Sequence, residues 1–268
     1  MKLFEKNSVS LTAGKANYAD FICVVISVCL FLAFWQFSSK LFPRARMIPP
    51  PSAVIPAFIK SFSEPIGSQT MPGHILRSLY RVFLGFSLAA VTGVTLGILS
   101  GRSRLANAII NPFIELLRPI PGIAWIPIAI LWFGTGENGK VFILFIASFT
   151  IISANTHDGA RHVDPELIGA ARMLGASKTR IFFTVVLPCC VPQVFTGLQI
   201  GLTINFMTVV AAEMIRSRSG VGWIVSTGND SGNMTQVMVG LVAIGIIGFT
   251  LSALLRTAEK RLLKWNRN

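Results

Sequence analysis

The chain has 268 residues, of which 52% are hydrophobic and only 13% are charged. Because an ordinary soluble domain carries about 25% charged residues, this composition excludes a disordered chain and argues against a soluble enzyme. The net charge of +13 does not indicate a nucleic-acid partner, since the basic residues flank apolar runs and are explained by contact with anionic membrane lipid. The sequence predicts an integral membrane protein.

Six stretches are apolar enough to cross a bilayer, which takes about 20 residues of helix. They are residues 21–37, 82–100, 112–133, 141–156, 189–212 and 237–255. The first stretch carries no charge, is too long for a cleavable signal peptide and lacks a small-residue cleavage site. We therefore expect residues 1–20 to form a cytoplasmic N-terminus and residues 21–268 to form a single transmembrane domain.

The segment 38–78, between the first two spans, contains one candidate helix. Ser52 is its predicted N-cap. Its apolar residues fall on one side of the helix; they are Val54, Ile55, Phe58, Ile59 and Phe62. Two placements stay open, along the outer membrane surface or against the helix bundle.

The second and third spans carry opposite packing signals. In the second, Gly85, Ala89, Gly93 and Gly97 recur at four-residue spacing, which lets another helix approach closely in lipid. The third begins with Pro112 and contains Pro119, Pro121 and Pro127 farther along. It must therefore be kinked or broken, and non-helical backbone at that depth has to face protein or a watery cavity.

Basic residues in the connections set the orientation. After the second span, eleven Lys and Arg lie in one set of connections and the C-terminal tail, and three lie in the opposite set. Since cytoplasmic loops are the basic ones, both termini are predicted to be cytoplasmic.

Two motif searches predict no cofactor and no metal on this chain. GTGENGKV, residues 134–141, follows a P-loop pattern up to Lys140, but Val141 stands where a P-loop has Ser or Thr to hold Mg²⁺. Cys23, Cys29 and the adjacent pair 189–190 lack metal-site spacing. The chain therefore has no ATPase machinery of its own.

The connection 157–188 predicts a short helix on the cytoplasmic face, over about 165–175. Asp164 is a good N-cap, and Pro165 suits the first helical position. Gly175 can end the helix in the left-handed conformation. Its apolar stripe consists of Leu167, Ala170, Ala171 and Leu174. A lone helix of this length is marginal in water, so it must pack against its own bundle or a partner protein.

GAARMLG, residues 169–175, is followed nine residues later by VVLP, residues 185–188. This spacing resembles the cytoplasmic "EAA" signature of ABC-importer permeases. The sequence departs from it at Gly169, where the family often has Glu, and Glu166 lies one turn earlier. Further segments within about residues 49–265, such as RPIPGIAWIPIAILWFGTGENGK and AAEM, resemble the nitrate/sulfonate/taurine subgroup.

The resemblance implies an all-α, MetI-like type I importer fold with six transmembrane helices and a core over about 74–256. It also implies a multi-pass protein of the bacterial inner membrane that forms the path for a small, anionic solute. The implied partners are two copies of a cytoplasmic ABC ATPase that carry ATP and Mg²⁺, a second permease copy, and a periplasmic or lipid-anchored binding protein. A homodimer is preferred, while a heterodimer and the exact solute stay open.

Two groups of site residues follow. The resemblance assigns ATPase docking to Glu166, Gly169, Ala170, Ala171, Arg172, Leu174, Gly175 and Lys178, with lipid head groups an equal alternative for Arg172 and Lys178. Polar residues in the fifth span are candidates for the substrate path; they are Thr203, Asn205, Thr208 and Glu213. Asn205 could instead form a hydrogen bond between helices, and Glu213 could pair with Arg216 or Arg218.

The main alternative is an ion-coupled secondary transporter. It needs carboxylates buried in the middle of its spans, and the central parts of these spans contain no Asp or Glu. A membrane enzyme would need clustered His, Asp or Glu on one face, which the sequence also lacks.

Overall fold

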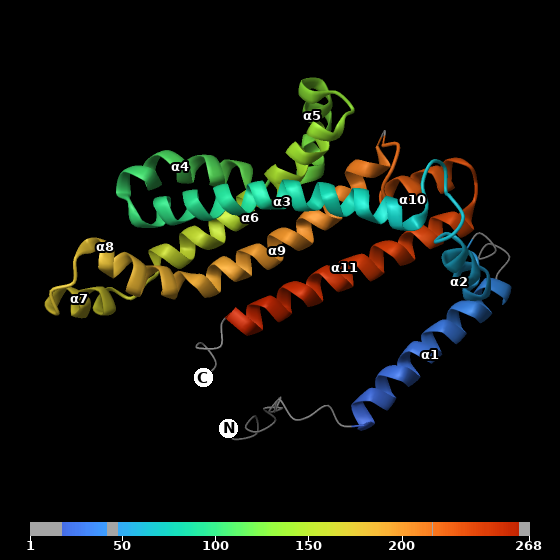
Figure 1. Ribbon diagram of the computed structural model, residues 1–268, viewed down its shortest axis with the longest axis horizontal. Coiled ribbons are helices and arrows are strands. Elements are labelled where there is room, and N and C mark those ends of the chain that lie inside the picture. Colours follow the sequence, from blue (N-terminus) through green and yellow to red (C-terminus); the bar gives the residue numbers. More distant parts are fainter. Residues whose placement is uncertain (1–17, 42–47, 216, 263–268) are drawn as a thin grey trace, which may run out of the picture. The chain divides into compact units, whose positions relative to one another are not determined.

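The computed structural model describes residues 18–41, 48–215 and 217–262, and it divides the chain into two compact units, 1–56 and 57–268. The helices are α1 (Tyr18–Leu41), α2 (Pro51–Lys60), α3 (Met71–Arg102), α4 (Arg104–Leu117), η2 (Gly122–Trp125), α5 (Ile126–Phe133), α6 (Glu137–Arg161), α7 (Pro165–Met173), α8 (Lys178–Ile181), the π-helical turn η3 (Phe182–Val186), α9 (Leu187–Met214), α10 (Val221–Asp230) and α11 (Met234–Leu262) (Figure 1). Within these described residues the regular elements are helices, as the sequence predicts.

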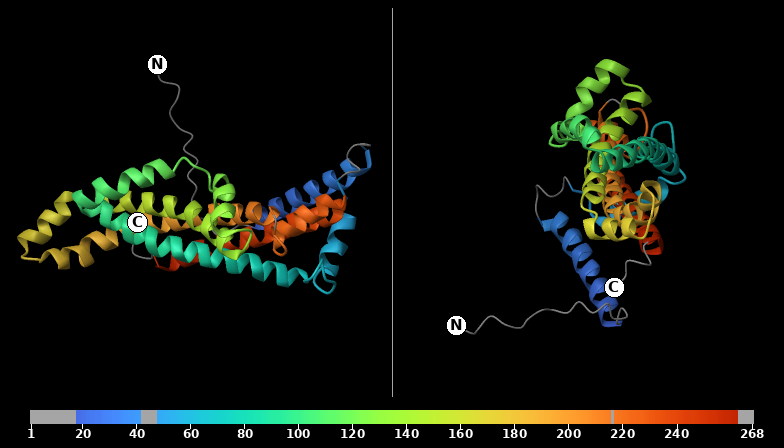
Figure 2. Two further views of the ribbon diagram at one scale, coloured as in Figure 1. Left: turned by 90° about the horizontal axis from the view of Figure 1, so that it is seen from above. Right: turned by 90° about the vertical axis from the view of Figure 1, so that its left-hand side faces the viewer.

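The centre of the unit 57–268 is a layer of long helices in which α6 packs against both α3 and α9. Figure 1 shows α7 and α8 at one end of this layer and α10 at the other, and the second view from above agrees (Figure 2). The fold therefore places both parts of the EAA-like signature, residues 169–175 and 185–188, at the same end of the helix layer.

The small-residue stripe of α3 lies against α6. Gly85, Ala89, Gly93 and Gly97 are all buried. A Cβ built on Gly85 would lie 2.5 Å from the Cβ of Leu144, and one on Gly97 would lie 2.6 Å from the Cβ of Thr156. The predicted close approach of a second helix is confirmed, and α6 is that helix.

The proline-rich third stretch is broken, as predicted. α4 and the η2–α5 segment meet at an angle of 92°, with Pro119 and Pro121 in the link between them. Five helices are long and apolar enough to cross a membrane by themselves, and the count reaches six if this bent pair forms one span. The six predicted spans are thus all present as apolar helical segments.

The long spans extend beyond their apolar stretches, and two of them show why. α6 continues to Arg161, because its polar last turns pack against other helices. The fifth segment is helical from Lys178 to Met214, since the turn η3 joins α8 to α9. In this segment Pro188 closely follows the π-helical turn η3, and Pro192 lies inside α9.

The candidate helix in segment 38–78 is α2, but its predicted cap is wrong. The helix begins at Pro51, and the carbonyl of Pro50 accepts hydrogen bonds from the N–H groups of Ala53 and Val54. Ser52 instead bonds through its hydroxyl and N–H to the side chain of Gln36. The sequence signal for a cap failed because a proline at the first helical position left the preceding residue as the cap.

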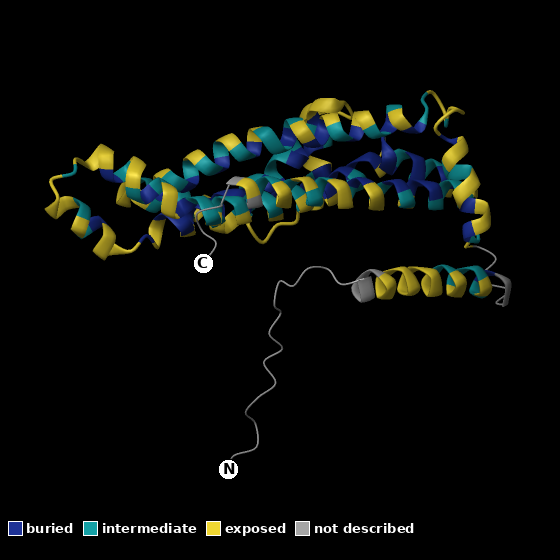
Figure 3. Ribbon diagram, turned by 60° about the horizontal axis from the view of Figure 1, so that its bottom comes forward, coloured by how far each residue is buried: buried dark blue, intermediate teal, exposed yellow. Residues whose placement is uncertain are grey.

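Large apolar side chains cover the outward faces of the long helices. Leu131 is 81% exposed and Phe249 is 78% exposed, and Figure 3 shows exposed residues along the outer sides of the helices in the unit 57–268. Apolar surface on this scale needs an apolar surrounding, which agrees with helices that stand in lipid.

Candidate functional site

α7 is the short helix that the connection 157–188 predicts, and both of its ends are capped. At the start, the Asp164 carboxylate accepts a hydrogen bond of 2.8 Å from the N–H of Glu166. At the end, Gly175 has a φ of +79°. The N–H of Gly175 donates to the carbonyl of Arg172, and the N–H of Ala176 donates to the carbonyl of Ala171. This pattern is a Schellman motif, so the ends of α7 are fixed by local backbone chemistry.

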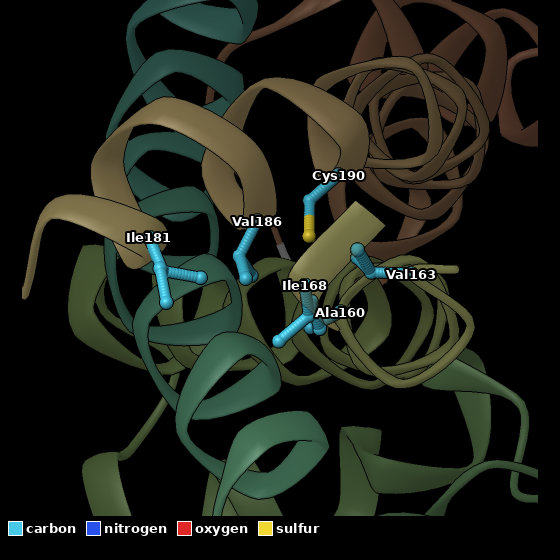
Figure 4. Close-up of a cluster of buried hydrophobic side chains, with 6 residues drawn as sticks. All are labelled: Ala160, Val163, Ile168, Ile181, Val186 and Cys190. Atoms are coloured by element: carbon cyan, nitrogen blue, oxygen red, sulfur yellow. The ribbon is translucent and has the colours of Figure 1, made fainter. Parts of the chain in front are cut away.

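One face of α7 is anchored to the helix bundle through Ile168. This side chain is 9% exposed and belongs to a buried cluster with Ala160, Val163, Ile181, Val186 and Cys190 (Figure 4). The cluster joins α7 to the end of α6, to α8 and to the start of α9. Burying an isoleucine side chain stabilises the folded state by about 1.5–3 kcal/mol. This contact therefore stabilises α7, which is too short to be a stable helix by itself.

The other face of α7 presents apolar side chains to its surroundings. Leu167 is 50% exposed, Met173 is 85% exposed and Leu174 is 87% exposed, and Ala170 is exposed beside them. The predicted stripe is correct for three of its four members. Ala171 is the exception, since it lies three residues after Ile168 and therefore packs against the buried cluster.

Gly169 and Gly175 both lie in open space. A Cβ built on either glycine would meet no atom within 4 Å among the described residues. A larger side chain therefore fits at Gly169, where the family signature has Glu. Gly175 is different, because its left-handed backbone conformation penalises any other residue.

Arg172 and Lys178 line a separate pocket on the flank of α7. Its volume is about 240 Å³, and its walls are Arg102, Ile168, Arg172, Lys178, Ile181, Phe182 and Val186. Arg172 lies four residues after Ile168, so it shares the side of α7 that faces the bundle. Of the eight residues assigned to docking, Arg172 and Lys178 thus line this basic pocket, and Ala171 packs against the buried cluster. The others lie on the outward face or at the ends of α7.

The polar residues of the fifth span are in α9 and have different surroundings. Thr203 is exposed and lines a groove of about 400 Å³ between α9 and α11. Thr208 is buried and donates to the carbonyl of Ile204. Asn205 is fully buried, and its amide donates to the Leu144 carbonyl at 3.1 Å and to the Ser148 hydroxyl at 2.7 Å. Asn205 therefore makes the hydrogen bond between helices that the sequence left as its second explanation.

Glu213 is the fourth candidate, and of its two predicted partners the described one, Arg218, forms no ion pair with it. Its carboxylate is fully buried and lies 2.6 Å from Nη1 of Arg81, a residue of α3 that is itself 1% exposed. It also accepts hydrogen bonds from the Ser78 hydroxyl and the Gly222 N–H. Arg81 reaches Glu137 on α6 as well. Arg216 lies outside the described residues, and Arg218 is exposed.

The amino-acid sequence that forms these helices matches a known protein family. Residues 93–267 match the family described as the binding-protein-dependent transport system inner membrane component. The chain belongs to this family. It is the membrane-spanning permease subunit of an ABC importer in the inner membrane.

Curated relatives cover nearly the whole permease. It is 34% identical over 247 residues to the taurine transport system permease protein TauC of Escherichia coli, which covers 91% of this chain and 88% of TauC. It is 32% identical over 239 residues to the nitrate import permease protein NrtB of Synechocystis sp., with 87% of this chain and 86% of NrtB covered. These similarities place the permease in the nitrate/sulfonate/taurine subgroup.

Solved structures confirm the fold of the permease. A chain of an amino acid ABC transporter aligns with a TM-score of 0.60 at 17% identity, covering 77% of this chain and 94% of the other. A chain of the MetNI methionine ABC transporter aligns with a TM-score of 0.59 at 20% identity, covering 72% and 94%. The fold is that of a MetI-like type I importer permease.

Sequence reasoning missed two residues that organise the permease. Ile168 anchors α7, and its spacing of three to Ala171 and five from Val163 was a usable local signal. Arg81 had no such signal, because its partner Glu213 lies 132 residues away along the chain.

Proposed function

We propose that this permease moves a small anionic solute, of the sulfonate, nitrate or taurine kind, and is driven by a separate ABC ATPase that docks on α7. The observation that carries the proposal is a short helix with two fixed ends, one anchored face and one exposed apolar face. The names of TauC, a taurine transport permease, and NrtB, a nitrate import permease, support the class of solute.

The outward face of α7 is the proposed docking surface. Its members lie away from the buried cluster or at the exposed end of the helix; they are Glu166, Leu167, Gly169, Ala170, Met173 and Leu174. A few well-packed side chains near the centre of a protein interface supply most of its binding energy. Glu166, in the first turn of α7, supports a polar contact in place of the Glu that the family signature has at position 169.

The anchored face of α7 explains how docking could do mechanical work. The cluster around Ile168 joins α7 to both α6 and α9, and these long helices pack along each other. A displacement of α7 therefore moves α6 and α9 together rather than bending a loop. Two such permeases, each moved by one ATPase, would alternate access by rigid-body change, with a binding protein delivering the solute.

The docking half of the proposal is tested by Leu174→Asp. The variant puts a charge on an exposed side chain, so the permease should still insert and fold. We expect the affinity for the co-expressed ABC ATPase to fall roughly 30-fold, since a central apolar contact is worth about 2 kcal/mol. Co-purification, with the ATPase identified by mass spectrometry, measures it. Thr179→Asp, which adds the same charge on α8, is the matched control, and equal ATPase recovery in both variants would refute docking on α7.

The solute half is tested by uptake. Vesicles that contain the permease, its ATPase and its binding protein should accumulate labelled taurine, nitrate or an alkanesulfonate only when ATP is present. Methionine, whose anionic group is a carboxylate rather than a sulfonate or nitrate, serves as the comparison solute. Uptake of methionine without uptake of any of the three anions would show that the solute class is wrong while leaving the transport function intact.

A further inference from the structure

The pocket beside α7 collects positive charge from three separate segments. Arg102 ends α3, Arg172 lies in the last turn of α7, and Lys178 begins α8. These residues are far apart in sequence, and only the packing of α7 and α8 near the end of α3 brings them to one cavity of about 240 Å³.

The charge of this pocket is not balanced by the protein. The residues of the described chain that line it include no carboxylate. In the same described ranges, the ion pairs of the structure involve other residues and leave Arg102, Arg172 and Lys178 out. Three cations around one small cavity repel one another, and an anion with several oxygen atoms would remove that repulsion and accept hydrogen bonds from both guanidinium groups.

The remaining walls of the pocket are apolar. Ile168, Ile181, Phe182 and Val186 line it together with the three cations. Ordinary pockets for whole small molecules are about 300–1,000 Å³, so this cavity fits one head group rather than a larger ligand. A site that joins basic and apolar surface at the end of transmembrane helices suits a phospholipid, whose phosphate is next to hydrocarbon.

We propose that this pocket binds a phosphate group, and that the phosphate belongs to an anionic phospholipid of the surrounding membrane. The lipid would bridge the end of α3 to α7 and α8. It would thereby fix the flank of α7 to the bundle while the outward face of α7 stays free. Arg172 and Lys178 then act as lipid contacts, and the docking surface keeps the residues on the opposite side of the helix.

The experiment compares two triple variants of the full-length permease in detergent, without any ATPase. One changes the pocket, as Arg102→Gln, Arg172→Gln and Lys178→Gln. The other changes three exposed cations outside it, as Arg104→Gln, Arg161→Gln and Arg180→Gln. Both variants lose the same charge, so general attraction to anionic lipid falls equally. The probe is dioctanoyl-phosphatidylglycerol, and the readout is its dissociation constant, measured by thermal stabilisation.

We expect the pocket variant to bind this lipid about 100-fold more weakly than the wild type, because each of the three side chains loses a charge-assisted hydrogen bond to the phosphate that is worth at least about fivefold. The control variant should bind within about threefold of the wild type. Inorganic phosphate should stabilise neither protein at the lipid concentrations used, which separates a lipid site from a site for free phosphate. Melting temperatures without lipid show that both variants are folded.

Three results would overturn the proposal. Equal loss of lipid affinity in both triple variants would mean general charge attraction. Stabilisation by inorganic phosphate as strong as that by the lipid would mean a site for a free anion. Unchanged lipid affinity in the pocket variant, together with loss of the co-purified ATPase, would mean that the cations contact an acidic segment of that partner. Because the lipid measurement needs no ATPase, its failure leaves the proposed docking on α7 untouched.

Discussion

Arg81 forms ion pairs and hydrogen bonds with residues of several separate segments of the permease. It is 1% exposed and pairs with the fully buried Glu213 at 2.6 Å and with the half-exposed Glu137 at the same distance. It also donates to the carbonyl of Ser219, just before α10. One guanidinium group thus links α3, α6, α9 and the turn that leads to α10. Removing it would leave a buried carboxylate without its counter-charge.

We predict that Arg81→Gln lowers the free energy of unfolding by about 3–5 kcal/mol, because it leaves Glu213 buried and uncompensated. The double variant Arg81→Gln, Glu213→Gln should recover part of this loss, since the uncompensated charge is gone. Denaturant unfolding in detergent measures both.

The control for this prediction is the exposed pair Lys60–Glu64, whose side chains are 67% and 60% exposed. Lys60→Gln should cost less than about 1 kcal/mol. A loss for Arg81→Gln that is no larger than this one would show that the buried pair does not hold the helices.

At the scale of elements, the contact between α3 and α6 depends on glycine. Built Cβ atoms on Gly97 and Gly101 would fall 2.7 Å from the backbone oxygens of Ser153 and His157. A backbone atom cannot move aside as the end of a flexible side chain can, so the two helices would have to separate. Gly245 in α11 has nothing within 4 Å of its built Cβ among the described residues.

We therefore expect substitution by alanine to have opposite effects at Gly97 and at Gly245. Gly97→Ala should destabilise the permease by about 1–3 kcal/mol through overpacking. Gly245→Ala should leave it unchanged or up to about 1 kcal/mol more stable, because alanine favours the helix. Thermal unfolding of the two variants side by side tests this, and equal melting temperatures would contradict the close packing of α3 on α6.

At the scale of the unit 57–268, α6 connects the two ends of the helix layer. It has 25 residues, which at 1.5 Å each is about 37 Å of helix. Glu137 at its start contacts Arg81, and Ala160 near its end belongs to the cluster that anchors α7. A motion imposed on α7 at one end would therefore reach the ion pairs at the other end through one continuous helix.

The sequence by itself determined most of the features that depend on neighbours within a few turns, although it misplaced the cap of α2 and missed the anchor Ile168. Composition and apolar length predicted helices in a membrane, Pro119 and Pro121 predicted the break after α4, and Asp164 and Gly175 predicted both ends of α7. Such features follow from backbone conformation and from capping within a few residues. The repeated glycines of α3 likewise predicted close packing, though not which helix would supply it.

Only the tertiary structure decided the contacts between distant segments. Glu213 was expected to pair with Arg216 or Arg218, and the structure places it in an ion pair with Arg81. The sequence allowed two explanations for Asn205, and its hydrogen bonds to Leu144 and Ser148 decide between them. The basic pocket needs Arg102 next to Lys178, which are 76 positions apart. Hydropathy and helical period indicate which face of a helix is apolar, but they do not indicate which other helix packs against that face. Ion-pair partners depend on that packing, so the sequence could not predict them.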